Sequence, residues 1–192
     1  MSNIYFFSGP CGCGKSTLTD AFAKHLVKDK EKQQVFVIHG DDFHAGFVLR
    51  SYEVENFWEG GQAANQLEWE EILKFNWECI IDIAGKALKR GIDVLIDYVV
   101  EEEMPLLRKL ADEYSAKLYY VVLTASEEAI TERIRARGDV EMIERALFLK
   151  KELDEMAENQ GHLYDNSQKE LDEEVAEISA NIESYLVWGE NL

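Results

Sequence analysis

Cysteine and proline are scarce in this chain, and long apolar runs are missing. The 192 residues include three cysteines and two prolines, and a small odd number of cysteines does not make a disulfide framework. No apolar run is long enough to cross a bilayer, and the first residues do not have the basic and apolar regions of a signal peptide. No Pro-, Ser- or Gly-rich linker and no internal repeat occurs. We therefore expect one cytoplasmic domain without a membrane partner.

Basic residues are also few, because 20 lysines and arginines face 38 aspartates and glutamates for a net charge of −18. A surface this negative repels phosphate backbones, so we expect no nucleic-acid partner. A small anionic ligand would need a locally basic pocket. The expected partner is a small-molecule substrate, and the expected state is a monomer or a homodimer.

Short apolar runs that end at polar residues alternate with helical patterns along the chain. Leu18, Phe22 and Leu26 recur every four residues, as on the buried face of a helix. Alternating strands and helices predict an α/β fold with a parallel sheet covered on both faces. Ligands of such sheets bind outside the carboxyl ends of the strands. The expected strands are 3–8, 35–38, 92–96, 118–123 and 162–164, and the expected helices are 15–27, 66–89, 104–114, 126–137, 140–158 and 169–186.

The run Gly9-Pro10-Cys11-Gly12-Cys13-Gly14-Lys15-Ser16 has the spacing of a P-loop and lies between an expected strand and an expected helix. Its glycines let successive backbone N–H groups point inward around a phosphate, and the following helix adds a partial positive charge. Lys15 can reach the β- and γ-phosphates, and the Ser16 hydroxyl can bind Mg²⁺. The alternative is a glycine-rich turn without function. The expected nucleotide contacts are Gly9, Cys11, Gly12, Cys13, Gly14, Lys15, Ser16 and Thr17.

Carboxylates follow two of the other expected strands. Asp41 and Asp42 come after 35–38, where a carboxylate could orient a substrate hydroxyl and accept its proton. We expect Asp41 to be the base, with Asp42 as the second choice. Asp97 ends the strand 92–96, and such an apolar strand can deliver one carboxylate toward the metal that Ser16 binds. The alternatives are an N-cap or an Asx-turn at the first position and a turn-forming Asp at the second.

Arg133 and Arg137 lie four residues apart and would share one face of the helix 126–137. Two guanidinium groups on one face can clamp the charge of a transferring phosphoryl group. The alternative is a solvated helix whose arginines pair with neighbouring glutamates. Their position after the fourth expected strand favours catalytic arginines in a lid at about 133–145, with Arg133 also contacting the nucleotide.

The stretch from about 43 to 66 has no clear periodicity and forms an expected substrate-side insert within a single domain of residues 1–192. An aromatic-lined pocket that contains one arginine would suit a small polar ligand, so we expect Arg50 to contact the substrate. The alternative is the ordinary packing of a helical flap. His39 and His44 lack a third ligand at metal spacing, and neither is assigned to a metal.

With these residues identified, the chain resembles the P-loop small-molecule kinases, the group that includes gluconate, shikimate, nucleoside and nucleotide kinases. The segment His39-Gly40-Asp41-Asp42-Phe43-His44 is similar to the Gly-Asp-x-x-His segment of gluconate kinases and to the Asp-Asp-Phe-Tyr segment of uridine kinases. This resemblance implies that Asp41, Asp42 and His44 contact the acceptor. Tyr164-Asp165-Asn166-Ser167 resembles the loop that borders the adenine, which assigns Asn166 to the nucleotide.

The resemblance further implies a three-layer α/β/α sandwich, a five-stranded parallel sheet in the order 2-3-1-4-5, and ATP with Mg²⁺ as donor. The chain also departs from the group. His39 stands where shikimate and gluconate kinases tend to carry an Asp, and Tyr98-Val99-Val100-Glu101 replaces the segment expected after the third strand.

Three hypotheses about function follow. The first is an ATP-dependent kinase that phosphorylates a hydroxyl of a small molecule, with gluconate or a related sugar acid as the first candidate. The second is a nucleoside or nucleotide kinase. The third, of another class, is a nucleotide-dependent switch or binding module without a small-molecule acceptor.

Overall fold

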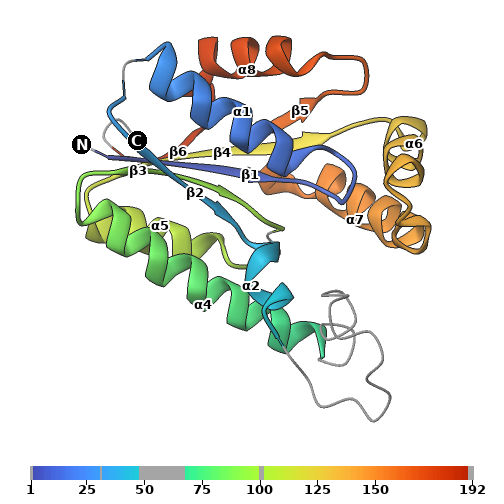
Figure 1. Ribbon diagram of the computed structural model, residues 1–192, viewed down its shortest axis with the longest axis horizontal. Coiled ribbons are helices and arrows are strands. Elements are labelled where there is room, and N and C mark those ends of the chain that lie inside the picture. Colours follow the sequence, from blue (N-terminus) through green and yellow to red (C-terminus); the bar gives the residue numbers. More distant parts are fainter. Residues whose placement is uncertain (1, 31, 48–67, 100–101, 190–192) are drawn as a thin grey trace.

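The computed structural model describes residues 2–30, 32–47, 68–99 and 102–189 of the chain. Its centre is a parallel sheet with the strand order β2-β3-β1-β4-β5 (Figure 1). A sixth strand, β6, pairs antiparallel with β4. The strands are β1 (Asn3–Ser8), β2 (Val35–His39), β3 (Asp93–Asp97), β4 (Lys117–Thr124), β5 (Leu163–Asp165) and β6 (Leu186–Trp188).

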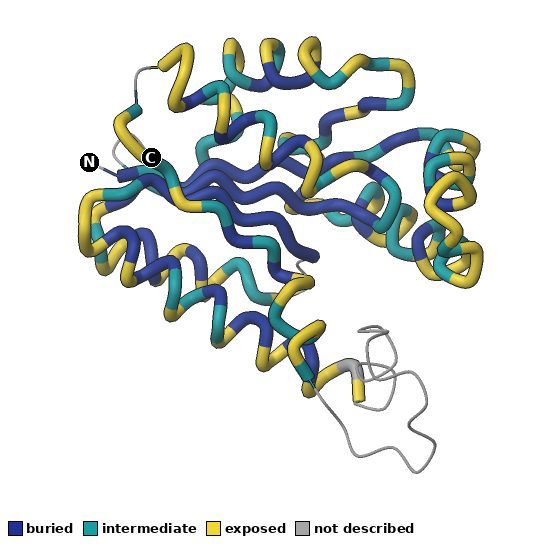
Figure 2. The backbone as a smooth tube through the Cα atoms, viewed as in Figure 1, coloured by how far each residue is buried: buried dark blue, intermediate teal, exposed yellow. Residues whose placement is uncertain are grey.

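The central strand β1 carries apolar side chains on both faces, as expected for a strand of a parallel sheet that helices cover on both sides. Ile4 and Phe6 belong to the core on one face, whereas Tyr5 and Phe7 belong to the core on the other. All four are buried, and the sheet as a whole is the most buried part of the chain (Figure 2). This rigid centre fixes the loops that follow the carboxyl ends of the strands.

The helices form the two outer layers of the sandwich. Helices α4, α5 and α7 pack on one face and α1 and α8 on the other, while α6 lies beyond the carboxyl ends of the strands (Figure 1). No helix in the described ranges is both long and apolar enough to span a membrane. The helices are α1 (Lys15–Lys28), α2 (Asp41–Ala45), α4 (Trp69–Leu88), α5 (Met104–Glu113), α6 (Glu127–Arg137), α7 (Ile143–Glu155) and α8 (Leu171–Ala180).

The expected order 2-3-1-4-5 and the three-layer arrangement are confirmed, but the end of the chain was predicted wrongly. The expected helix 169–186 stops early, because α8 ends at Ala180 and the 3-10 turn η3 (Ile182–Tyr185) leads into β6. A three-residue strand is too short to show a period of two, and β6 is held by its pairing with β4. Residues 140–158 likewise divide into the turn η1 (Val140–Met142), α7 and the turn η2 (Ala157–Asn159).

Replacing a core ring of β1 should cost far more stability than replacing an exposed ring of β2. Phe6 is fully buried, and its ring centroid lies 5.7 Å from that of Trp77 and 5.5 Å from that of Tyr120. Phe6→Ala should therefore lower the free energy of unfolding by about 3–5 kcal/mol in urea denaturation. Phe36 is 43% exposed, so Phe36→Ala should cost less than about 1 kcal/mol. Equal losses would contradict the assignment of the core.

Candidate active site

The loop of residues 9–14 leaves β1 and opens helix α1 at Lys15. Gly9 has a φ of 142°, and a Cβ at this position would lie 2.5 Å from the carbonyl oxygen of Leu123. No side chain fits there, so the loop can pass close to the end of β4. The first N–H groups of α1 have no partner within the helix, and an anion is favoured at such an end.

The Lys15 ammonium lies across this loop. Its Nζ donates hydrogen bonds to the carbonyl oxygens of Gly9 at 2.9 Å and Pro10 at 3.2 Å. The buried thiol of Cys13 also donates to Pro10, at 2.8 Å, and burial raises the pKa of this thiol. Cys13 is therefore a protonated packing residue, whereas Lys15 is the cation that can meet an anion on the loop.

Ser16 and Asp97 meet where β1 and β3 end. The Ser16 hydroxyl donates to Asp97 Oδ1 at 2.7 Å, and the Asp97 side chain is buried. The parallel register, which pairs Phe7 with Asp97, places the last residue of β3 beside the strand that precedes the loop. The pairing of the two strands thus brings together a hydroxyl and a carboxylate that are 81 positions apart in sequence.

The other Asp97 oxygen is held by His39. Oδ2 lies 2.5 Å from His39 Nδ1, and His39 Nε2 lies 3.5 Å from Asp20 Oδ1. Burial would lower the pKa of His39, but the hydrogen bond to Asp97 and the charges of Asp97, Asp20 and Asp42 outweigh burial and raise it. Burial raises the pKa of Asp97 against the opposing hydrogen bonds of Ser16 and His39. Because the pKa values of both groups are raised, one proton is shared between His39 and Asp97.

Asn166 joins helix α6 to the P-loop. It follows β5, is buried, and donates from Nδ2 to the carbonyl oxygen of Cys13 at 2.9 Å and to Glu174 Oε2 at 3.1 Å. Arg133 of α6 donates to Asn166 Oδ1 at 3.0 Å and to its backbone oxygen at 2.9 Å. Burial raises the pKa of Glu174, opposed by the Asn166 hydrogen bond and the Arg133 charge. Asn166 and Arg133 are therefore fixed beside the loop.

Arg137 reaches the same loop by a different contact. One guanidinium nitrogen lies 3.0 Å from Cys11 Sγ and 3.1 Å from Asp139 Oδ2. Beneath it, a small apolar cluster that includes Ile130 and Ile134 of α6 packs against Cys11. Helix α6 is thus in contact with the P-loop, and Arg133 and Arg137, two of its three arginines, lie on that side.

Asp41 and Asp42 are the first residues of α2, and both are exposed. The N-cap is Gly40 rather than either aspartate. A Cβ at Gly40 would lie 2.4 Å from the ring of Tyr98, so the turn requires a glycine. Burial raises the pKa of Tyr98 and the charge of Asp41 adds to that shift, whereas Asp42 acts on the pKa of His39. The charge of Asp41 is therefore felt at Tyr98, and the charge of Asp42 is felt at His39.

The buried side-chain amide of Asn76 holds the ring of His44 in place. Asn76 of α4 is fully buried, and its Nδ2 donates to His44 Nδ1 and to the Tyr98 hydroxyl oxygen, both at 2.7 Å. An accepting Nδ1 leaves the ring proton on Nε2, so His44 can present a donor. Asn76 Oδ1 has no hydrogen-bond partner among the described residues. This network holds His44 of α2 in contact with α4 and with Tyr98.

Sequence reasoning missed several residues of this site. It assigned no role to His39, although this polar residue ends the strand that pairs with the strand of Asp97. Asn76 could have been noticed as a polar residue on the apolar face of a helix. Arg145, in the first turn of α7, is a third such residue: burial raises the pKa of Tyr98, and the charge of Arg145 opposes that shift. Arg50, by contrast, lies outside the described residues.

The groups around the loop fit a nucleoside triphosphate with Mg²⁺. Backbone N–H groups, Lys15 and the end of α1 can donate to phosphate oxygens. The Ser16 hydroxyl and the Asp97 carboxylate are the hard oxygen ligands that Mg²⁺ prefers. No group of three His, Cys, Asp or Glu side chains in the described residues could hold a metal by itself. This agrees with an ion whose other ligands are phosphate oxygens and water.

Comparison with known proteins places the chain in a family. The family model AAA_18, described as an AAA domain, matches residues 6–160, and the chain belongs to this family. No curated protein sequence matches it.

Solved structures share the fold at low sequence identity. APS kinase from Mycobacterium tuberculosis, in complex with AMPPNP and APS, has 17% identity and a TM-score of 0.63, with 95% of this chain and 98% of that chain covered. A gluconokinase from Sinorhizobium meliloti has 18% identity and a TM-score of 0.56, covering 95% and 94%. A sugar kinase from Janibacter has 12% identity and a TM-score of 0.60, covering 96% of both chains.

The His39–Asp97 pair should make the protein less stable as the pH rises. The pKa of His39 is raised in the folded state. The stability that protonated His39 contributes is therefore fully present below its unfolded-state pKa of about 6.5. That contribution is lost as the pH rises through the folded-state pKa, and the raised pKa of Asp97 acts in the same direction. Without Mg²⁺ or nucleotide, the free energy of unfolding of the wild type minus that of His39→Asn should fall as the pH rises above about 6.5. A constant or rising difference would contradict this coupling.

Proposed function

We propose that this protein transfers the γ-phosphoryl group of ATP to a hydroxyl of a small molecule. The observation that carries the proposal is the hydrogen bond between Ser16 and Asp97 beside a P-loop that Lys15 crosses. This pair offers Mg²⁺ two hard oxygen ligands next to a loop that offers donors to phosphates. Kinases of small molecules among the structures that share the fold support the same reaction type.

Lys15 and the loop amides would bind the β- and γ-phosphates of ATP, while Ser16 and Asp97 would hold Mg²⁺, which offsets phosphate charge. Asp41 would accept the proton of the acceptor hydroxyl as its oxygen bonds to the γ-phosphorus and the bond to the β–γ bridging oxygen breaks. Arg133 and Arg137, held at the loop by Asn166 and Cys11, would stabilise the charge on the transferring group.

Asn166 would also border the adenine, because it is buried beside the loop at Cys13. On the acceptor side, His44 would donate a hydrogen bond from Nε2 to the substrate, since Asn76 occupies its Nδ1. Asp42, whose charge acts on the pKa of His39, is the weaker candidate for the base. Arg50 is proposed as a further substrate contact from the sequence alone.

The identity of the acceptor molecule is a more specific proposal than the reaction type. Gluconate or a related sugar acid is the acceptor that the resemblance suggests, and a nucleoside is the alternative. Among the described residues that act electrostatically on Tyr98, the carboxylates of Asp41 and Glu103 are opposed by the cation of Arg145. An anionic acceptor would therefore meet two carboxylates and one cation on this side, without the cluster of cations that would favour it strongly.

Substitution of Lys15 and of Asp41 should separate nucleotide binding from transfer. Lys15→Ala should weaken ATP binding and abolish ATP consumption, because the loop loses its cation. Asp41→Asn should lower transfer by about 10²–10⁴-fold, the usual share of a general base, while it leaves ATP affinity within about twofold, since the side chain lies outside the loop. Asp42→Asn removes the neighbouring carboxylate and should lower transfer much less than Asp41→Asn does.

The measurement is ATP consumption against a panel of sugar acids, amino alcohols, nucleosides and nucleotides, with ATP affinity from calorimetry. Full activity of Asp41→Asn would refute its role as the base. Stimulation of the Lys15→Ala variant equal to that of the wild type would refute transfer at this loop.

A further inference from the structure

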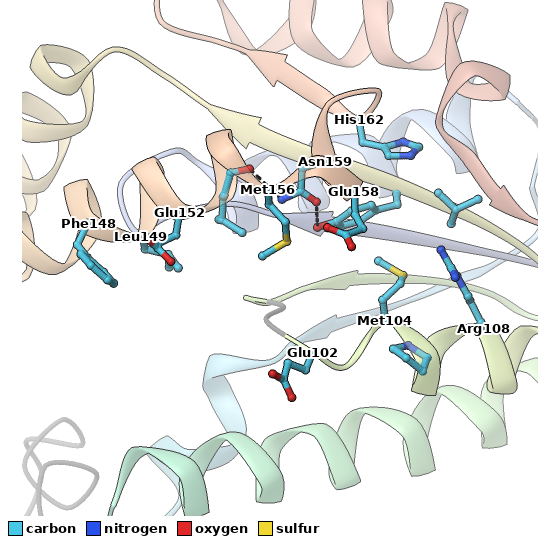
Figure 3. Close-up of a pocket in the computed structure, with 14 residues that line it drawn as sticks. Glu102, Met104, Arg108, Phe148, Leu149, Glu152, Met156, Glu158, Asn159 and His162 are labelled. Carbon is cyan, nitrogen blue, oxygen red and sulfur yellow. Dashed lines mark hydrogen bonds between the residues drawn. The ribbon is translucent and has the colours of Figure 1, made fainter.

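A groove of about 650 Å³ lies between α5 and α7 on the sheet face opposite α1 (Figure 3). Met104 and Arg108 of α5 line one wall, and Leu149 and Met156 line the other, along and just beyond α7. Tyr120 of β4 also lines the groove. The volume is that of a site for a small organic molecule, and none of the residues assigned to phosphate or metal belongs to its walls.

One end of the groove lies next to the acceptor side of the active site. Glu102 and Phe148 line this end. Glu102 follows Tyr98 by four residues, and the ring of Tyr98 packs over Gly40. Since Gly40 directly precedes Asp41 at the start of α2, a molecule that fills the groove can extend a hydroxyl toward Asp41.

The charge of the groove favours a cation. Its walls carry the carboxylates of Glu102, Glu152 and Glu158 against the guanidinium of Arg108. Burial lowers the pKa of His162, and the charge of Arg108 lowers it further, so the imidazole is neutral at pH 7. The lining therefore has a net negative charge, and an anionic ligand would be repelled along most of its length.

The remaining surface is apolar, with a fixed polar group at the inner end. Tyr120 donates its hydroxyl hydrogen to Asn159 Oδ1 at 3.0 Å, and Asn159 Nδ2 donates to the carbonyl oxygen of Leu153 at 3.0 Å. Both side chains are thus held in place. His162 Nδ1 is buried without a hydrogen-bond partner among the described residues. The inner end of the groove is therefore lined by polar side chains in fixed positions.

We propose that this groove binds the body of the phosphoryl acceptor, and that the acceptor is an organic cation with an apolar body, a protonated amine and a hydroxyl group. The carboxylates bind the amine, the methionines and leucines contact the body, and the hydroxyl extends toward Asp41. This inference rests on the proposed function and replaces the sugar acid with a hydroxylated amine as the substrate class. It does not depend on residues 48–67.

A matched pair of probes tests the charge of the groove. Phenylethanolamine and mandelate each carry a phenyl ring on a hydroxyl-bearing carbon, but the first is a cation and the second an anion. Binding is measured by ligand-observed NMR on the full chain, with and without ATP and Mg²⁺. We expect phenylethanolamine to bind at least about tenfold more tightly than mandelate, as several nearby carboxylates attract one and repel the other.

Variants locate the binding. Leu149→Trp should fill the groove and abolish the phenylethanolamine signal, whereas Leu106→Trp, at an exposed position of α5 outside the lining, should leave it unchanged. Glu152→Gln should weaken binding by about threefold, and Glu155→Gln, also exposed on α7 but outside the lining, should not. Circular dichroism and ATP binding of each variant verify that it is folded.

The outcomes separate this inference from the proposed function. Equal binding of the two probes, binding that survives Leu149→Trp, or no binding by a folded protein that binds ATP would overturn the groove as a cation site. ATP consumption is measured in parallel with larger amino alcohols that share this pattern. If the amines bind in the groove and no acceptor on the panel stimulates ATP consumption, the groove stands as a binding site and the kinase proposal fails. If only sugar acids stimulate consumption, the kinase proposal stands and this inference fails.

Discussion

The contact between Ser16 and Asp97 is the interaction on which the arrangement of the site depends. Ser16 belongs to the first turn of α1, and Asp97 is the last residue of β3. Their hydrogen bond of 2.7 Å exists because β1 and β3 are adjacent, parallel and in a register that ends both strands together. A slip of one residue in that register would turn Asp97 to the other face of the sheet and away from the loop.

The rest of the site is built outward from this contact. His39, at the end of β2, holds the second oxygen of Asp97, so three neighbouring strands converge on one carboxylate. On the other side, Asn166 ties the end of β5 to both the loop and Arg133. A chain of net charge −18 thereby places Lys15, Arg133 and Arg137 around a single loop. Local positive charge in an acidic protein lets the site attract a triphosphate while the surface repels larger polyanions.

The sequence predicted the fold well because its patterns are local. The glycine-rich run after a strand and the four-residue spacing of Leu18, Phe22 and Leu26 both depend on neighbouring residues, and all three apolar side chains are buried in the structure. Strand β6 was not predicted because three residues are too few to show the alternation of a strand. Its stability depends on pairing with β4, which is distant in the sequence. The family resemblance, rather than any local pattern, supplied the strand order.

Residues of the candidate site could be predicted only where a local sequence pattern indicates their chemical role. Lys15, Ser16 and Asp97 follow from a motif and from the end of an apolar strand. The roles of His39 and Asn76 depend on which side chains the fold brings into contact with them. The spacing of residues in the sequence does not predict those contacts. The groove between α5 and α7 is a further case, because its lining comes from segments about 50 residues apart that the sheet alone places opposite each other.

Calorimetry of ATP binding with and without Mg²⁺, in the wild type and in Asp97→Asn, tests the central claim most directly. If Ser16 and Asp97 jointly hold the metal of a bound nucleotide, Mg²⁺ should tighten ATP binding to the wild type by at least about tenfold, and the variant should lose most of that gain, since a carboxylate is a far better Mg²⁺ ligand than an amide. An equal gain from Mg²⁺ in both proteins would contradict the metal site, and with it the arrangement from which phosphoryl transfer is inferred.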